Sequence, residues 1–379
     1  MKIKQLVFHE GVWNTSKESA NFDTDEAQLV LAFGERTLLE QNIHYDFLHQ
    51  KFPKADIILN STSGEIHNDG VYDNTIVATA ITFEKTKVRT IAVDIKNHIE
   101  SYQAGAKIAN DLLEENNLKA IMIISDGSRV NGTRLTQALN EITSYKVQIT
   151  GGLAGDQDRF QKTLVGLNSE PQEGKIIGIG FYGNNITIGH GTQGGWDAFG
   201  PEREITKSEY NILYGIDNKP ALDLYKEYLG SYAAELPGAA LRFPILLQST
   251  QNSSPVVRTI LSINEEDNSL TFAGDVPTGS SIRFMKANFD RIIDASATAT
   301  EQAMTRLTTA PELAILISCV GRKLVLGQRT EEEIEVAKEI FGNETLISGF
   351  YSYGELAPSN STKCELHNQT MTITTFAEN

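Results

Sequence analysis

The chain has 379 residues, enough for two or three domains, and with 40% hydrophobic and 22% charged residues it can bury a full core in each. That composition excludes a disordered protein and a coiled coil. The 33 lysines and arginines against 49 aspartates and glutamates give a net charge of −16, which disfavours binding to nucleic acid and to anionic membrane surfaces.

One pattern of elements occurs three times along the chain. In each copy an apolar strand ends in a glycine-containing turn, an amphipathic helix follows, and a second apolar strand runs into a glycine with a nearby acidic residue. The strand, helix and strand of the first copy are expected at 28–33, 36–51 and 55–60. Those of the second are expected at 120–124, 132–143 and 147–150, and those of the third at 313–317, 330–341 and 345–347.

Two β-type segments follow each copy, so the predicted unit is β-α-β-β-β. These pairs are 75–83 with 88–95, 175–182 with 185–191, and 364–366 with 370–376. Two strands joined by one helix are normally parallel, with a right-handed crossover. Both glycine-containing turns of a copy then lie at one edge of a sheet, where open α/β sheets bind their ligands. We therefore expect a ligand crevice between these turns.

The segments between the copies predict further elements. A helix is expected at 97–115, a glycine-rich boundary zone at 196–200, and a helix that begins at Pro220. Strands are expected at 245–247, 256–263, 269–273 and 281–285, and a helix at 289–306. The sequence thus predicts a mixed α/β fold in which mixed sheets are flanked by helices. We expect two domains, 25–230 with two repeat units and 237–376 with one unit and extra strands.

The cysteine content and the N-terminus bear on the location of the protein. Cys319 and Cys364 are too few for a disulfide framework, and no CxxC pair or histidine cluster predicts a metal site. The N-terminal residues lack the apolar core and the cleavage site of a signal peptide, and no stretch approaches the roughly 18 apolar residues of a membrane span. We therefore expect a cytoplasmic protein without membrane insertion.

The third copy holds the candidate residues with the most distinctive chemistry. Arg322 follows the Gly321 turn at a strand end, and its guanidinium is suited to bidentate binding of a ligand carboxylate, with an ion pair as the structural alternative. Cys319 is a candidate nucleophile if a base activates its thiolate, and otherwise a small buried residue. Tyr351 and Tyr353 alternate in an extended segment and can form either a crevice wall or part of the core.

Acidic residues occupy matching positions in the three copies. Glu65, Asp156 and Glu355 each lie beside a glycine in the second turn, where they can bind a ligand ammonium or accept hydrogen bonds as caps of turns and helices. Asp126 ends the opening strand of the second copy, where a plain Asp-Gly turn is the alternative. The turns add three further residues to the expected ligand-binding set, Ser348, Gly349 and Gly152.

No motif in the sequence requires a cofactor. None of the seven histidines forms an HxxxH or HExxH pair, so a haem would depend on a lone axial histidine, with His190 and His98 as candidates. The glycine-rich segment 151–155 lacks the lysine of a phosphate-binding loop and the spacing of the dinucleotide fingerprint. We therefore expect no cofactor and no metal ion, with haem as the open alternative.

Five motifs, in order along about 300 residues, resemble the FIST family of F-box and intracellular signal transduction proteins. They are STSGE at 61–65, GGLAGD at 151–156, SCVGR at 318–322, GFYSYGELAP at 349–358 and LHNQT at 366–370. The resemblance spans residues 25 to 376 and includes an N-terminal and a C-terminal FIST region.

The resemblance implies a sensory module of signal transduction that binds a small polar, amino-acid-like ligand. Family members are often fused to histidine kinases, chemoreceptor domains or cyclic-dinucleotide enzymes, and some look like haem-based nitric oxide sensors. The two FIST regions nearly fill this chain, so we expect it to signal to a separate output protein such as a histidine kinase. We expect no enzymatic activity. The open alternatives are a haem-binding nitric oxide sensor, an acyl transferase or hydrolase that uses Cys319 with His367 as its base, and a scaffold that binds only proteins.

Overall fold

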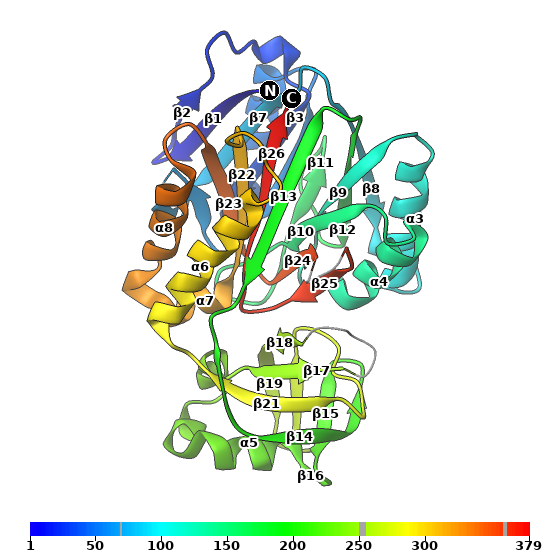
Figure 1. Cartoon of the computed structure of the whole chain (residues 1–379), viewed down its shortest axis with the longest axis vertical. Helices are drawn as coiled ribbons and strands as arrows, with labels where there is room; N and C mark the ends of the chain where they lie inside the picture. Colours follow the sequence, from blue (N-terminus) through cyan, green and yellow to red (C-terminus); the bar gives the residue numbers. More distant parts are fainter. Residues whose placement is uncertain (69, 250–254, 359–361) are drawn as a thin grey trace.

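The computed structural model describes residues 1–68, 70–249, 255–358 and 362–379. In these residues the chain forms a larger body with three six-stranded sheets and a smaller lobe with a fourth, eight-stranded sheet (Figure 1). The chain enters the lobe through β14 (Asp197–Glu209) and leaves it through β21 (Ser281–Lys286). Both termini lie together at the end of the body that is remote from the lobe.

Each sheet of the body draws its strands from distant parts of the chain. In spatial order, the first sheet contains β11 (Val165–Leu167), β4 (Asp56–Ser61), β3 (Leu29–Gly34), β7 (Ile76–Thr82), β1 (Lys2–His9) and β2 (Val12–Glu18). The second contains β25 (Cys364–His367), β24 (Gly354–Pro358), β10 (Gln148–Leu153), β9 (Leu118–Ser125), β12 (Lys175–Tyr182) and β8 (Lys87–Asp94). The third contains β13 (Ile186–Gln193), β26 (Met371–Glu378), β22 (Leu313–Cys319), β23 (Leu346–Ser352), β5 (Glu65–His67) and β6 (Gly70–Tyr72).

The three sheets follow one plan in which the copies exchange strands. A parallel pair from one copy lies at the centre, beside an antiparallel strand of the same copy. The strand on the other side of the parallel pair comes from a different copy: β11 pairs with β4, β24 with β10, and β5 with β23. The antiparallel strand of each sheet has a further neighbour on its other side. In the second and third sheets this neighbour comes from a different copy, since β8 pairs with β12 and β13 pairs with β26. In the first sheet β1 pairs with β7 in this position. Each copy therefore depends on other segments to complete its hydrogen bonds.

The body strands are apolar on both faces because both faces of each sheet are covered. In β9, Met122 and Ile124 belong to a central core where the three sheets meet, whereas Ile121 and Ile123 face the outer helices. Residues of the other two sheets that complete the central core include Leu31, Phe33, Ile315, Ile317 and Phe350. Burial of each such side chain stabilises the fold by about 1.5–3 kcal/mol.

Helices cover the outer faces of the three sheets (Figure 1). They are α1 (Arg36–Leu39) and α2 (Ile43–Lys51) on the first sheet, α3 (Ser101–Leu113) and α4 (Gly132–Ile142) on the second, and α6 (Phe289–Met304) and α8 (Glu332–Phe341) on the third. The short helix α7 (Val320–Leu326) follows β22 directly. Among the described residues, no helix combines the length and the apolar character needed to cross a membrane.

The lobe is an antiparallel sheet with one helix packed on it. Its remaining strands are β15 (Ile212–Ile216), β16 (Lys219–Pro220), β17 (Ile245–Gln248), β18 (Val256–Arg258), β19 (Ile260–Asn264) and β20 (Ser269–Phe272). The helix α5 (Ala221–Leu229) buries Leu222, Leu224 and Tyr225 in the core of the lobe. Short 3-10 helices are η1 (Thr24–Glu26), η2 (Ile95–Asn97), η3 (Gly230–Glu235), η4 (Gly238–Arg242) and η5 (Gly327–Arg329).

The predicted mixed α/β class, the repeating units and the two-part organisation are confirmed. Several details differ from the expectation. The helix expected at 36–51 is divided by a turn, and the strand expected at 256–263 is divided into β18 and β19. The elements that were not expected are α7 and the strands β1, β2, β5, β6, β11, β14, β15, β16 and β24. The lobe sheet occupies 197–286, and the domain limits 25–230 and 237–376 stay a prediction.

Two glycines let β13 pack closely against α6. A Cβ atom added to Gly191 would lie 1.9 Å from Ala299 O, and one added to Gly189 would lie 1.9 Å from Ala303 O. We expect Gly191→Ala to lower the free energy of unfolding by about 1–3 kcal/mol, because strand and helix must separate. Chemical denaturation measures this loss. The control Gly238→Ala, where an added Cβ meets nothing within 4 Å, is expected to change stability by less than about 0.5 kcal/mol, and equal losses would contradict the close-packing argument.

Candidate ligand-binding cleft

The parallel strands of the third copy end at the junction of the body and the lobe. β22 and β23 run side by side, with Cys319 opposite Ser352, so the two turns of this copy meet at one sheet edge. Gln369, in the turn before β26, donates from Nε2 to Leu241 O of the lobe at 3.2 Å. The edge at which the sequence predicts a crevice therefore faces the lobe.

A buried ion pair between α7 and α8 lies beside these two turns. Arg322 donates to Glu333 Oε2 from Nε at 3.0 Å and from Nη2 at 2.7 Å, and both side chains are fully buried. The guanidinium also donates to Gly194 O at 2.6 Å and to Ile292 O at 2.8 Å. The Tyr351 hydroxyl donates to Glu333 Oε1. Because every guanidinium nitrogen already donates within the protein, this arrangement corresponds to the ion-pair alternative for Arg322.

Cys319 lies beneath the same edge and is 3% exposed. Burial raises the pKa of its thiol, and the nearby Glu355 carboxyl adds to this effect. Since the thiolate is the reactive form, such a thiol is a poor nucleophile. This environment favours the small buried residue over the catalytic cysteine.

Two of the three matching acids occupy equivalent places. Glu355 accepts hydrogen bonds from Ser352 Oγ at 2.6 Å and from Thr370 Oγ1 at 3.0 Å. Glu65 accepts hydrogen bonds from Thr75 N at 3.2 Å and from Thr75 Oγ1 at 2.7 Å. Burial raises the pKa of both carboxyls to about 8. Each is therefore neutral at pH 7 and links its turn to a neighbouring strand.

The third matching acid, Asp156, reaches from the second copy to the first. Its Oδ1 accepts from Arg36 Nε at 2.9 Å and from Arg159 Nε at 2.8 Å. Arg159 also pairs with Glu35, at the end of β3, at 2.6 Å. This network of charges spans the edge where β3 and β4 end, so Asp156 joins two copies.

The other predicted site residues also have partners within the protein. Asp126 accepts hydrogen bonds from the backbone amides of Ser128 and Arg129 at 2.7 and 2.6 Å. Tyr353 stacks on Phe160, with ring centroids 4.6 Å apart. The three residues added from the turns lie inside strands, Ser348 and Gly349 in β23 and Gly152 in β10. The structure thus brings Cys319, Arg322 and Tyr351 together near one sheet edge, whereas Ser348 and Gly349 lie inside β23. Asp126, Gly152 and Asp156 remain in the second copy.

A cleft of about 690 Å³ opens beside these buried turns. None of the ten residues predicted to bind the ligand lines it, although His190 and His367, which the alternative functions would use, do. Its walls come from β13 and the glycines that follow it, from the C-terminal end of α6, from β18 and β21 of the lobe, and from the turn before β26. The Trp196 ring is part of the wall, and its Nε1 donates to Gln369 O at 2.9 Å. This bond fixes the point at which the chain enters the lobe. We call this space the junction cleft.

The charge of the junction cleft differs from that of the whole chain. Among the described residues that line it there is no aspartate or glutamate. Arg306, just after α6, is exposed, and within the described residues its guanidinium has no ion pair or hydrogen bond. His190 and His367 add two imidazoles, and burial lowers the pKa of both, that of His190 to about 4. The cleft therefore combines one cation with neutral polar groups.

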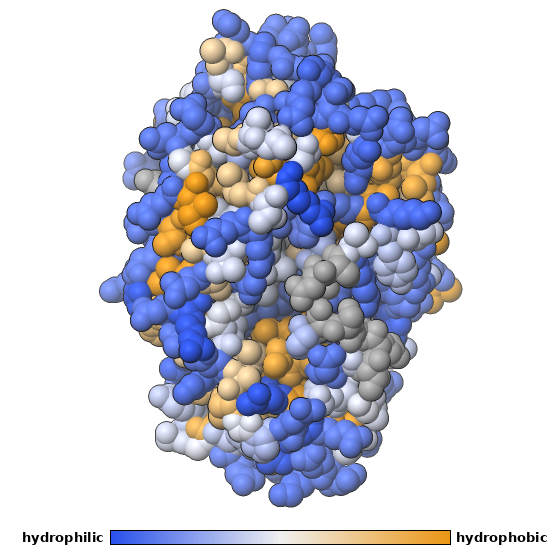
Figure 2. All heavy atoms as spheres, in the orientation of Figure 1, coloured by the Kyte–Doolittle hydropathy of each residue, from blue (hydrophilic) through white to orange (hydrophobic). Residues whose placement is uncertain are grey.

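Two polar atoms in the cleft walls lack partners among the described residues, namely His190 Nδ1 and Thr192 Oγ1. Buried polar atoms are normally hydrogen-bonded, so both are unsatisfied among the described residues. The backbone amide of Thr192 donates to Gln302 Oε1 at 3.2 Å, which positions the Gln302 side chain beside them. In the space-filling view, hydrophobic residues gather near the junction of the body and the lobe, and further hydrophobic patches lie on both sides of the body (Figure 2).

The histidines of the cleft do not fit the haem alternative. A histidine that binds iron normally donates its second ring N–H to an acceptor, but His190 Nδ1 has none among the described residues. His367 is 6% exposed, and its Nε2 lies 3.1 Å from Ala357 O, so this nitrogen is in contact with a backbone carbonyl group. Nor do the described residues contain a group of three or more histidine, cysteine, aspartate or glutamate side chains arranged for a metal ion.

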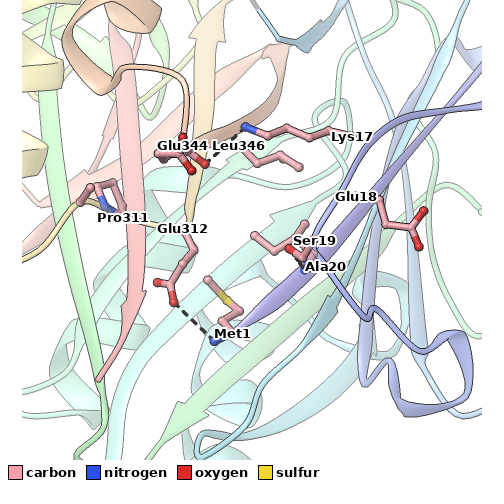
Figure 3. A pocket seen from close by; sticks show the side chains of 11 residues that line it. Met1, Lys17, Glu18, Ser19, Ala20, Pro311, Glu312, Glu344 and Leu346 are labelled. Atoms are coloured by element: carbon pink, nitrogen blue, oxygen red, sulfur yellow. Dashed lines mark hydrogen bonds and ion pairs between the residues drawn. The ribbon is translucent and has the colours of Figure 1, made fainter.

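A smaller pocket of about 380 Å³ lies at the other end of the body, near the chain termini (Figure 3). Its cationic groups already have partners. The amino group of Met1 lies 3.4 Å from Glu312 and 3.3 Å from Glu378, and Lys17 Nζ donates to Glu344 O at 3.3 Å. We therefore regard the junction cleft as the better candidate for a binding site.

Two of the sequence patterns contain residues that line the junction cleft. The glycine-rich boundary zone contains Trp196, and the closing motif at 366–370 contains His367. Arg306 belongs to no such pattern, because a single arginine after a helix is usually an ordinary surface residue.

Two family models match consecutive parts of the chain, the FIST N domain over residues 28–219 and the FIST C domain over residues 221–358. The chain belongs to the FIST family. FIST domains are sensory domains of signal transduction. The two matches meet inside the lobe, at β16, so both FIST regions contribute to the lobe sheet. A search of curated proteins found no match to this chain.

Proposed function

We propose that this FIST protein senses a small anionic or zwitterionic metabolite, such as an amino acid, bound in the junction cleft. The observation that carries the proposal is the charge of the cleft. A chain of net charge −16 has no acidic side chain among the described residues that line this cleft, and it presents there Arg306, which has no ion pair with any of these described residues. A guanidinium with nearby hydroxyl and imidazole groups is suited to a ligand carboxylate.

The ligand signals by favouring one arrangement of the body and the lobe. Its contacts with the body include Arg306 and Thr192, whereas those with the lobe include Val257 and Met285. A ligand shifts such an equilibrium only by the difference between its affinities for the two arrangements, and a few kcal/mol suffice. In this proposal a separate cytoplasmic output protein, such as a histidine kinase, recognises the favoured arrangement. The free buried thiols of Cys319 and Cys364 are consistent with a reducing compartment.

A ligand screen by thermal unfolding tests the proposal. We expect at least one compound among amino acids, dicarboxylates and other small acids to stabilise the protein. A ligand at 100 times its Kd adds about 2.7 kcal/mol to the free energy of unfolding. Neutral nucleobases serve as comparison compounds.

Variants then locate the binding site. Arg306→Ala is expected to raise the Kd of the ligand about tenfold or more, because a charge-assisted hydrogen bond is lost. The control Arg329→Ala removes an exposed arginine that does not line the cleft, and we expect it to leave the Kd unchanged. A screen without any stabilising acid, or equal affinities of the Arg306→Ala variant and the unmodified protein, would contradict the proposal.

A further inference from the structure

A second groove crosses the junction and shares no lining residue with the junction cleft. It consists of two adjoining pockets of about 550 and 370 Å³, which have Asp158 and Leu324 in common. The larger pocket has walls from both parts of the molecule. Phe289 and Leu324 belong to the body, whereas Leu261 and Pro237 belong to the lobe.

The larger pocket is apolar and open to solvent. The side chains of Phe160, Phe289 and Leu324 are each 42% exposed, and that of Leu261 is 44% exposed. These residues come from four separate segments of the chain. Large apolar side chains that gather at the surface mark interaction sites. Because each retains over two-fifths of its accessible surface, they form an open groove rather than a cavity that encloses a small ligand.

The charges along the groove leave one carboxylate free. Arg242 pairs with Glu235, and Lys323 pairs with Asp73. Asp158 is exposed and lies in the wall common to both pockets, and within the described residues its carboxylate has no ion pair or hydrogen bond. The groove therefore offers an apolar floor next to a single unpaired negative charge.

We propose that this groove is a docking site for a segment of a partner protein in which a large apolar side chain lies next to a lysine or arginine. The apolar side chain enters between Leu261 and Leu324, and the cation pairs with Asp158. A second copy of this chain is a less suitable occupant, because two chains that each carry a net charge of −16 repel each other. Since the walls belong to both the body and the lobe, the segment binds one relative arrangement of the two. This proposal does not depend on the ligand of the junction cleft.

The experiment selects short random peptides, displayed on phage, against the full chain and measures the affinity of enriched peptides by fluorescence anisotropy. We expect the enriched peptides to share a large apolar residue near a lysine or arginine. Leu324→Ser and Leu261→Ser are each expected to weaken their binding about tenfold or more, as for central interface residues. Asp158→Asn is expected to weaken binding and to reduce its dependence on salt. The control Ile99→Ser removes an apolar side chain that is 92% exposed elsewhere, and we expect no change.

Several outcomes would overturn the proposal. One is an enriched set of peptides without the apolar and basic pair. Another is equal binding to the unmodified chain and to both leucine variants, once thermal unfolding has shown that these variants are folded. A third is a dimer in sedimentation that Leu324→Ser dissociates, because the groove is then an interface between copies of the chain.

Discussion

Replacing Glu333 by alanine is expected to lower the free energy of unfolding by about 3–5 kcal/mol, because it leaves the Arg322 guanidinium buried without its counterion. Both side chains are fully buried, with Nη2 and Oε2 at 2.7 Å. Glu333 Oε1 also accepts hydrogen bonds from Tyr351 and from Ser318, and these donors lose their acceptor. Chemical denaturation at neutral pH measures the loss. We expect the Arg322–Glu333 pair to be the electrostatic interaction on which the third copy depends most.

Two controls separate the buried pair from the general effect of a glutamate substitution. Glu332 is adjacent, exposed and paired with Arg329, so Glu332→Ala is expected to cost less than about 1 kcal/mol. The double variant Arg322→Met with Glu333→Leu removes both charges and is expected to recover much of the stability lost in Glu333→Ala. Losses of the same size for Glu332→Ala and Glu333→Ala would show that the buried pair has no special role.

The second large effect is a loss of stability as the pH rises from about 6.5 to 8. The pKa values of Glu65 and Glu355 are raised to about 8 in the folded protein, against an ordinary value of 4.5. Between these values the folded chain keeps two protons that the unfolded chain has released. This stabilisation is fully present below pH 4.5 and is lost as the pH rises through about 8. Each carboxyl contributes a slope of up to about 1.4 kcal/mol per pH unit.

The histidines oppose this effect in the lower part of this pH range. Burial lowers the pKa of His44, His190 and His367 in the folded protein, whereas in the unfolded chain a histidine is half protonated at pH 6.5 and largely neutral only above about pH 7.5. Their contribution has the opposite sign, since stability rises with pH as the unfolded histidines lose protons, and it fades above about pH 7.5. Because this contribution is the same in glutamine variants of the two glutamates, the difference between the profiles of the unmodified protein and these variants isolates the glutamates.

Glutamine variants test the assignment, because glutamine imitates the neutral carboxyl. Glu355→Gln is expected to remove about half of the pH dependence, and the double variant with Glu65→Gln to remove most of it. The side-chain amide can keep the hydrogen bond to Thr370 that Glu355 makes, so we expect both variants to fold. The exposed Glu332→Gln is the control. A profile of the double variant that runs parallel to that of the unmodified protein would contradict the raised pKa values.

The candidate site could be predicted only in part from the sequence. The two turns of the third copy meet, as a parallel β-α-β connection requires. The sequence did not reveal that Glu333, on a helix with an exposed acidic face, turns inward and pairs with Arg322. Neither did it reveal Arg306 as a wall of the junction cleft. Both depend on which helix covers which strand end, and no local pattern encodes that.

The sequence by itself determined the local elements of this protein, because burial on both faces of a sheet selects apolar strands and burial on one face selects amphipathic helices. The three copies and the mixed α/β class follow from these patterns. Only the tertiary structure decided which strands exchange between sheets, as when β8 pairs with β12 and β13 with β26. Every strand offers the same backbone hydrogen-bonding groups, so the packing of the three sheets around the central core decides which strands become neighbours. The tertiary structure also forms the junction cleft and the groove proposed as a docking site, since the walls of both come from segments that meet only after the sheets have packed.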